Sequence, residues 1–137
     1  MRFNDRRAVV TGAGDGIGQA RAARLAEEGA RVLICDIDKA RASDAVAAIR
    51  AAGGTAEPCA MDVRNRDDVD AAVARIVDLW GRIDIQVSCT GIMDRAPFLE
   101  MSDELWHTIL DTNLHGAFLC GQIAARAMVA RGGGGRI

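Results

Sequence analysis

The sequence predicts a doubly wound α/β domain, in which helices cover both faces of a parallel β-sheet. Short apolar runs of strand length alternate with longer segments of helical period along the chain. Each apolar run follows a glycine or a charged residue, and such alternation is typical of right-handed crossovers between parallel strands. The chain has no internal repeat or linker, so we expect a single domain over residues 1–137.

The predicted strands are the short apolar runs, which span residues 7–11, 31–36, 55–62 and 83–89. The first helix is predicted over residues 16–28. Its apolar side consists of Ile17, Ala20, Leu25 and Ala26. The second helix should begin after Asp38, a capping residue whose carboxylate can accept hydrogen bonds from the first turn. It should end at Gly53 and Gly54, because glycine commonly terminates helices.

The third helix is predicted to start at Asn65, which together with Asp68 resembles a capping box. Its apolar stripe includes Val69, Val73, Ile76 and Val77. The fourth helix should start near Ser102, with two acidic residues in the first turn, where the helix dipole favours negative charge. It is predicted to run towards Met128.

Composition limits the function classes. The formal net charge is only −2, so we expect no nucleic-acid partner. No apolar stretch approaches the roughly 18 residues that span a bilayer, so we expect no membrane partner. The four cysteines are scattered without a C-x-x-C pair, which favours a reducing, cytoplasmic compartment over zinc or disulfides. His107 and His115 have no carboxylate nearby at metal-ligand spacing, so no metal site is predicted.

The turn between the first strand and the first helix reads T-G-A-G-D-G-I-G, residues 11–18. The spacing G-x-G-x-x-G fails here, whereas Gly12, Gly16 and Gly18 give T-G-x-x-x-G-x-G. Glycines allow positive φ and a close backbone approach to a pyrophosphate, and the helix start offers unpaired N–H groups. The turn therefore predicts phosphate binding, and the alternative is a glycine-rich turn that binds nothing.

An acidic residue, Asp36, ends the second predicted strand eighteen positions after Gly18. This is near the spacing of about 20 at which a carboxylate accepts hydrogen bonds from the adenosine ribose. Ile37 stands where a basic residue would receive a 2′-phosphate, and Asp15 adds a second carboxylate, without a local arginine partner for that phosphate. These residues favour NAD over NADP; the alternative is an ordinary aspartate at a strand end.

The glycine spacing and Asp36 resemble the short-chain dehydrogenase/reductase family, and the resemblance extends from the first strand to the last residue. The residues that match its cofactor-binding turn are Gly12, Gly16, Ile17 and Gly18. Asp62 and Val63, after the third strand, are similar to the family's adenine-contacting pair, in which the aspartate accepts from the exocyclic amine. Four motifs then follow one another in the family's order.

The last two of these motifs lie in the second half of the chain. S-C-T-G, residues 88–91, occupies the place where the family usually has N-N-A-G, and it keeps only the glycine, Gly91. Its hydroxyls can bond to neighbouring backbone but cannot reproduce paired amide groups. D-T-N-L-H-G-A-F-L resembles the helix that carries the family's catalytic asparagine, here Asn113.

The resemblance implies a Rossmann-like sheet of about four strands in the order 3-2-1-4. It implies hydride transfer between a nicotinamide cofactor, which Asp36 and Asp15 select as NAD, and a small alcohol or ketone substrate. Loss of the strand that pairs with the fourth strand would leave an open sheet edge, so we expect a homo-oligomer or self-association. In the family, a catalytic serine follows G-G-R-I, and a Tyr-x-x-x-Lys pair comes later. These positions would lie after Ile137, and the 137 residues contain no tyrosine and one lysine, Lys39. We therefore expect the cofactor-binding half of an oxidoreductase, truncated before the fifth strand.

Other functions remain open at this point. A non-catalytic dinucleotide-binding or interaction module that works at this length would carry the same motifs. A methyltransferase with a similar glycine loop is disfavoured by the later motifs. In the family's sheet order, the fourth strand pairs with a strand that would begin at Arg136.

Overall fold

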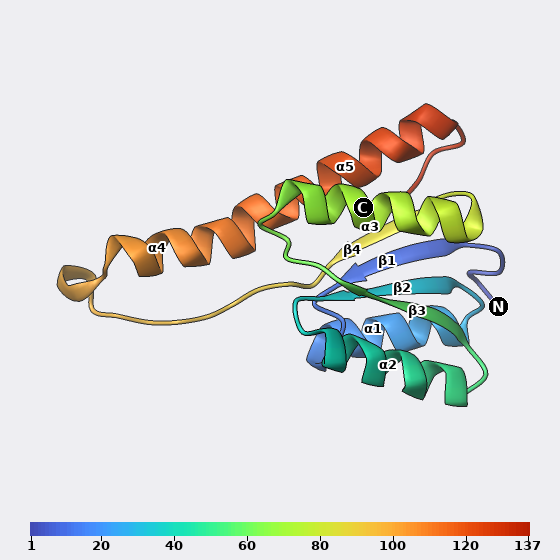
Figure 1. Ribbon diagram of the computed structural model, residues 1–137, viewed down its shortest axis with the longest axis horizontal. Coiled ribbons are helices and arrows are strands. Elements are labelled where there is room, and N and C mark those ends of the chain that lie inside the picture. Colours follow the sequence, from blue (N-terminus) through green and yellow to red (C-terminus); the bar gives the residue numbers. More distant parts are fainter.

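The computed structural model describes all residues, 1–137, and contains a four-stranded parallel sheet in the order β3-β2-β1-β4 (Figure 1). The strands are β1 (Arg7–Thr11), β2 (Arg31–Asp36), β3 (Thr55–Ala60) and β4 (Ile85–Ser88). The predicted fold class and strand order are confirmed. The third and fourth strands are shorter than the predicted segments 55–62 and 83–89.

Helices cover both faces of this sheet (Figure 1). Helices α1 (Gly16–Glu27) and α2 (Lys39–Ala51) lie on one face, and α3 (Arg66–Trp80) and α5 (Gly116–Arg131) lie on the other. The 3₁₀ turn η1 (Phe98–Glu100) and helix α4 (Asp103–Leu110) project beyond the sheet at the left of the view. No helix combines the length and apolar character that a membrane crossing requires.

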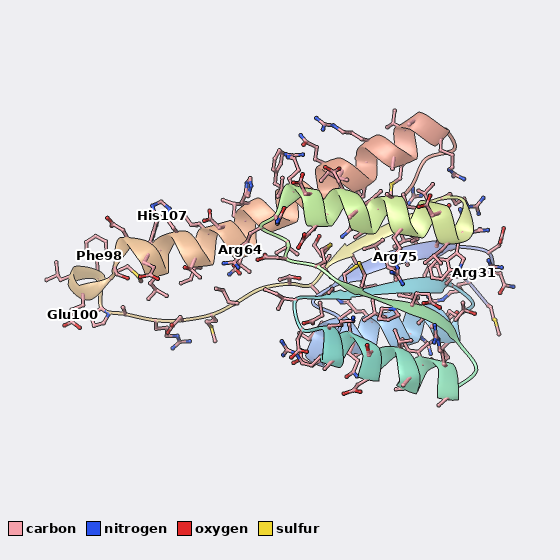
Figure 2. All side chains as sticks on the ribbon, in the orientation of Figure 1. Arg31, Arg64, Arg75, Phe98, Glu100 and His107 are labelled. Carbon is pink, nitrogen blue, oxygen red and sulfur yellow. The ribbon has the colours of Figure 1, made fainter.

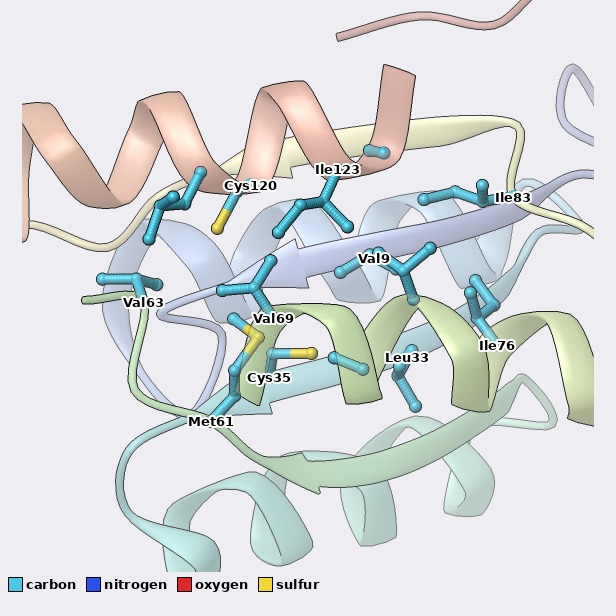
Figure 3. Close-up of a cluster of buried hydrophobic side chains, with 14 of the residues drawn as sticks. Val9, Leu33, Cys35, Met61, Val63, Val69, Ile76, Ile83, Cys120 and Ile123 are labelled. Carbon is cyan, nitrogen blue, oxygen red and sulfur yellow. The ribbon is translucent and has the colours of Figure 1, made fainter. Parts of the chain in front are cut away.

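The sheet separates two hydrophobic clusters. On β1, Val9 belongs to the cluster with α3 and α5, whereas Ala8 and Val10 belong to the cluster with α1 and α2. In Figure 3 the first cluster includes Leu33, Cys35, Val69, Ile76, Cys120 and Ile123. Both faces of the central strands are therefore buried, as in other parallel sheets, and the carboxyl ends of the strands are held in fixed positions.

Two predicted helix caps are confirmed. The Asp38 carboxylate accepts hydrogen bonds from the N–H groups of Ala40 (2.9 Å) and Arg41 (3.1 Å) at the start of α2. The Ser102 hydroxyl accepts one from the N–H group of Leu105 (3.1 Å) at the start of α4. These bonds satisfy N–H groups that have no partner within the helix.

The predicted capping box at α3 is wrong in one of its two bonds. The Asn65 side chain accepts from the N–H group of Asp67 (2.9 Å), as a cap should. Asp68 does not reach back to Asn65, whose N–H group donates to the Asp62 carbonyl (3.0 Å). Instead, Asp68 Oδ2 accepts from the N–H group of Asp62 (3.0 Å). The loop after β3 thus folds back on the start of α3, and Asp68 supports that loop.

Three packing predictions are also wrong. Ile17 is 72% exposed and Ala20 is exposed as well, because α1 meets the sheet through a row of small residues, Gly18, Ala22 and Ala26. Val77 is partly exposed, because α3 turns toward the core through Val69, Ala72, Val73 and Ile76. Both helices are present as predicted, and Ala26, Val69, Val73 and Ile76 are buried as expected, but part of each predicted apolar side faces away from the core.

The predicted fourth helix is present, starts after Ser102 and contains a π-helical turn. This turn, η2 (Asp111–His115), joins α4 to α5, and α5 passes Met128 and ends at Arg131. A π turn widens the helix locally, and such turns occur frequently at functional sites. Here the turn contains Asn113.

The residues after the four consecutive glycines lie beside β4. A parallel bridge joins Ile85 and Arg136. The N–H group of Gln86 donates to the Arg136 carbonyl (2.9 Å), and the N–H group of Arg136 donates to the Asp84 carbonyl (3.0 Å). The predicted pairing of the fourth strand with residues beginning at Arg136 is therefore confirmed for this bridge.

Candidate functional site

A cavity of about 510 Å³ lies where the carboxyl ends of the strands meet. Six residues predicted to bind a cofactor line it: Gly12, Asp15, Asp36, Asp62, Val63 and Gly91. The structure brings them together from the end of β2 and from the segments after β1, β3 and β4. This position, outside the carboxyl ends of strands in an open α/β sheet, is where ligands bind in such folds.

The glycine-rich turn forms one wall of the cavity, and its shape excludes larger side chains. Gly12 has φ of 59°, and a Cβ atom there would lie 2.9 Å from the backbone N and Cα of Thr90. A Cβ atom on Gly18 would lie 2.0 Å from the Gly12 carbonyl oxygen. Gly18 therefore allows α1 to begin directly against the turn, although it does not itself line the cavity.

Gly16 and Ile17 form the exposed start of α1. Gly16 has φ of 54°, and no atom lies within 4 Å of where its Cβ atom would be. Neither residue lines the cavity. Asp15, at the N-cap position, makes no side-chain capping bond. The first N–H groups of an α-helix have no partner within the helix, so this end of α1 can present donors to an anion.

Thr11, which the sequence analysis did not single out, holds the end of β4 against the glycine turn. Its side chain is buried, and its hydroxyl oxygen accepts from the N–H groups of Cys89 (3.1 Å) and Thr90 (3.3 Å). These bonds fix the S-C-T-G segment, which lacks the family's paired amides. The sequence could have indicated this contact, because the hydroxyl of a threonine at the end of a central strand can form hydrogen bonds with the end of the adjacent strand.

Asp36 is only 6% exposed and is held by the backbone around it. Its Oδ2 accepts from the N–H group of Gly14 (3.0 Å), and its Oδ1 accepts from the N–H group of Asp38 (2.9 Å). A Cβ atom on Gly14 would lie 2.8 Å from Oδ2. An ionised carboxylate can accept about four hydrogen bonds, so Asp36 retains acceptor capacity on the cavity side.

The expectation of no local arginine beside Asp15 and Asp36 is wrong. Arg41, on the first turn of α2, lines the cavity. Its guanidinium lies 2.9 Å from Asp15 Oδ2 and 3.5 Å from Asp36 Oδ1. Its contact with Asp15 depends on how α2 packs beside the glycine turn, so no local sequence pattern indicates it.

The loop after β3 forms the opposite wall. Asp62 pairs with Arg64 at 2.6 Å, and this hydrogen-bonded guanidinium lowers the pKa of Asp62. Val63 is buried, and a Cβ atom on Gly116 of α5 would lie 2.6 Å from its methyl carbon. Figure 2 shows Arg64 near the junction of α4 and α5. The lowered pKa keeps Asp62 a hydrogen-bond acceptor, although its carboxylate is already paired with Arg64.

Asn113 connects the π turn to the segment after β4. Its Oδ1 accepts from the N–H group of Ile92 (2.8 Å), and its Nδ2 donates to the Ile92 carbonyl (2.8 Å). A Cβ atom on Gly91 would lie 3.6 Å from Oδ1. Asn113 does not line the cavity, whereas Thr108 and Thr112, which the sequence analysis did not select, do.

The comparisons with known proteins agree with this geometry. A sequence model described as short chain dehydrogenase matches residues 6–137. The chain belongs to the short-chain dehydrogenase/reductase family. Members of this family bind nicotinamide dinucleotides and act on small alcohols or ketones.

Two curated relatives illustrate the similarity. The short-chain reductase protein NovJ of Streptomyces niveus is 47% identical over 130 residues, which cover 95% of this chain and 49% of that protein. A sorbitol dehydrogenase of Cereibacter sphaeroides is 39% identical over 137 residues, which cover 100% of this chain and 52% of that protein. The chain thus spans about half the length of these relatives.

Solved structures show the same fold. A short-chain type dehydrogenase/reductase from Mycobacterium marinum superposes with a TM-score of 0.94 at 38% identity. The match covers 97% of this chain and 54% of the other. A second protein, described as a putative short-chain dehydrogenase/reductase from Burkholderia xenovorans, gives a TM-score of 0.93 at 36% identity and covers 98% of this chain and 55% of the other.

Proposed function

We propose that this chain is the NAD-binding half of an oxidoreductase that transfers hydride between NAD and a small alcohol or ketone. The glycine turn ending at Gly18 holds the pyrophosphate, Asp36 accepts from the adenosine ribose hydroxyls, and Asp62 with Val63 contacts the adenine. The nicotinamide end lies toward Gly91. When bound, the nicotinamide ring supplies or accepts the hydride; the residues of this chain bind and orient the cofactor.

The fit of a dinucleotide is supported by the shape of the cavity. Side chains larger than hydrogen at Gly12 or Gly14 would meet backbone or carboxylate atoms closer than 3.0 Å. Because glycines have no side chain, main-chain atoms can pack closely at these two positions, next to the positive end of α1. The same cavity runs from Asp36 past Asp62 to Gly91, so one extended ligand can contact all three.

The position of Asp36 supports NAD over NADP as the cofactor. Its carboxylate is buried beside the glycine turn and lines the cavity, so a 2′-phosphate would be placed against a negative charge. Calorimetric titration of the protein with NAD and with NADP tests this choice. Tighter binding of NAD is expected; equal or tighter binding of NADP would remove Asp36 from this role.

We further propose that Asn113 acts as a positioning residue for the segment that borders the nicotinamide end. Both of its polar side-chain atoms are used to hold Ile92. The 137 residues contain no tyrosine, and Lys39 is their single lysine. By themselves they lack the positioned acid that the reaction requires, and a general acid or base typically contributes about 10²–10⁴-fold to the rate.

The remaining proposals concern substrate, assembly and location. Relatives named for sorbitol and galactitol support a small hydroxyl-bearing substrate, without selecting one. Helix α4 has no buried residue and presents Trp106, which is 54% exposed, and this supports a homo-oligomer or self-association. Four free cysteines support a reducing, cytoplasmic location.

A further inference from the structure

We propose that Arg41 determines how strongly this site discriminates against NADP. In the native site its guanidinium partly neutralises the carboxylates that would repel a 2′-phosphate. When the Asp36 carboxylate is removed, the same guanidinium becomes the receptor for that phosphate. This proposal rests on the proposed function, because it assigns the adenosine ribose to Asp36.

Three carboxylates surround the Arg41 guanidinium. It lies 2.9 Å from Asp15 Oδ2, 3.5 Å from Asp36 Oδ1 and 3.5 Å from Asp38 Oδ2. Because the cluster holds more negative than positive charge, it still repels an added phosphate. The repulsion is weaker than the carboxylates alone would produce, since opposite charges at 3–4 Å interact appreciably near a protein surface.

The backbone of Arg41 is fixed, whereas its head group is accessible. The N–H group of Arg41 donates to the capping carboxylate of Asp38 (3.1 Å). The Arg41 Cβ atom packs against the glycine turn, because a Cβ atom on Gly14 would lie 2.7 Å from it. The side chain is 47% exposed, so the guanidinium can exchange a carboxylate for another anion at the mouth of the cavity.

An arginine in this position suits a phosphate. Its planar group offers paired N–H donors that match phosphate oxygens, and such charge-assisted bonds are stronger than neutral ones. In the native site Arg41 Nη1 donates to Asp15 Oδ2 (2.9 Å), and Nη2 lies 3.5 Å from Asp36 Oδ1 without a hydrogen bond between them. Removing the charge of Asp36 removes the buried carboxylate nearest to Nη2, so this group can turn to a phosphate that the carboxylate no longer repels.

The test measures NAD and NADP affinity by calorimetry for the wild-type protein, Asp36→Asn, Arg41→Ala and the double variant. Asp36→Asn should bind NADP roughly tenfold more tightly than the wild type does. Adding Arg41→Ala should remove that gain while changing NAD affinity of Asp36→Asn by less than about threefold. Asp36→Asn/Arg41→Lys should retain part of the gain, because lysine keeps the charge but not the paired donors.

Arg24→Ala is the matched control. Arg24 is also an exposed arginine paired with two carboxylates, Glu27 (2.8 Å) and Glu28 (2.6 Å), but it does not line the cavity. The Arg24→Ala variant removes the same positive charge as Arg41→Ala, but away from the cavity. It should therefore leave the NAD and NADP affinities within about twofold of those of the wild type at moderate salt. Thermal unfolding verifies that each variant is folded, and Asp36→Ser replaces Asp36→Asn if the latter is not.

The measured affinities test the role of Arg41, the preference for NAD and nucleotide binding itself separately. Equal NADP affinity of the Asp36 variant with and without Arg41 would overturn this proposal and leave the NAD preference intact. Tighter NADP than NAD binding by the wild type, lost in Arg41→Ala, would overturn the NAD preference and support the role of Arg41. No binding of either nucleotide by the wild type would overturn the proposed function and this proposal with it.

Discussion

Gly18 has the least space of any glycine in the cofactor turn. A methyl group there would lie 2.0 Å from the Gly12 carbonyl oxygen, and both atoms belong to well-packed backbone. We predict that Gly18→Ala lowers the free energy of unfolding by about 1–3 kcal/mol or more and abolishes nucleotide binding. Denaturant unfolding with calorimetric titration measures both effects.

The control for this substitution is Gly121→Ala in α5. A Cβ atom at Gly121 would have its nearest neighbour at 3.8 Å, so the methyl group is accommodated. Alanine is favoured over glycine within a helix by roughly 0.5–1 kcal/mol, so Gly121→Ala should be neutral or stabilising. If Gly18→Ala were as stable as Gly121→Ala, the close packing of α1 on the turn would be contradicted.

The pKa values of Cys59 and Cys120 are shifted in opposite directions. The adjacent thiol of Cys35, its register partner on β2, and the charge of Arg75 lower the pKa of Cys59 to about 7. Burial raises the pKa of Cys120 to about 11. Since the thiolate is the nucleophile, alkylation of Cys59 by iodoacetamide should reach half its plateau rate near pH 7, with Cys120 unmodified.

Peptide mass spectrometry across a pH series measures these rates. A midpoint for Cys59 near pH 9, the range of an ordinary thiol, would contradict the assigned contact with Cys35.

The sequence predicts for some residues, but not for others, that they meet at the cavity. Gly12, Asp36 and Asp62 lie at or just after strand ends, and the carboxyl ends of parallel strands meet at one edge of a sheet. Their meeting at one cavity could therefore be predicted. Arg41 could not be predicted in the same way. Its distance to Asp15 depends on the packing of α2 beside α1, and side-chain reach across two elements has no local sequence pattern.

At the scale of elements, the strands and caps were predictable because they follow local rules. The apolar runs that predict β1 and β2 have the same bounds as the observed strands. Asp38 and Ser102 cap helices because their side chains accept hydrogen bonds from the first turn that follows them. The π turn η2 was not predictable from helical period. Its residue Asn113 makes two hydrogen bonds to Ile92, and a contact between residues so distant in sequence has no local pattern.

These bonds make a prediction for the segment after β4. Asn113→Ala removes both partners of the Ile92 backbone, so the amide hydrogen of Ile92 should exchange roughly tenfold faster or more. Asn113→Asp keeps an acceptor for the Ile92 N–H group and loses only the donor, so it should preserve most of the protection. Hydrogen exchange measured by NMR tests this, and unchanged protection of Ile92 in Asn113→Ala would exclude the positioning role.

At the scale of the whole molecule, the sheet core is complete around β1 and β2, but the projecting segment is not covered. Phe98 is 91% exposed, Leu99 is 94% exposed, and no residue of α4 is buried. Figure 2 shows Phe98 at the end of the projecting segment. On the side away from β1, β4 has only the bridge between Ile85 and Arg136. Exposed apolar side chains and a partly open strand edge both favour association with other chains.

We therefore predict that the 137 residues, expressed by themselves, self-associate at micromolar concentration. Sedimentation equilibrium measures the mass, and Trp106→Glu should lower it by placing a charge on the exposed side of α4. Val129→Glu is the comparison, because Val129 is also exposed but lies near the far end of α5. A monomer with wild-type sequence at these concentrations would contradict the prediction.

The central claim is that a nicotinamide dinucleotide binds at the carboxyl ends of the strands, along the cavity from Asp36 to Gly91. The most direct test is an NMR titration of the ¹⁵N-labelled protein with NAD, which follows each backbone amide. Saturable shifts are predicted for Gly14, Ile37, Val63 and their neighbours, with little change in the alanine-lined groove between α1 and α2. Saturable shifts centred on that groove, or none at millimolar NAD, would contradict the account.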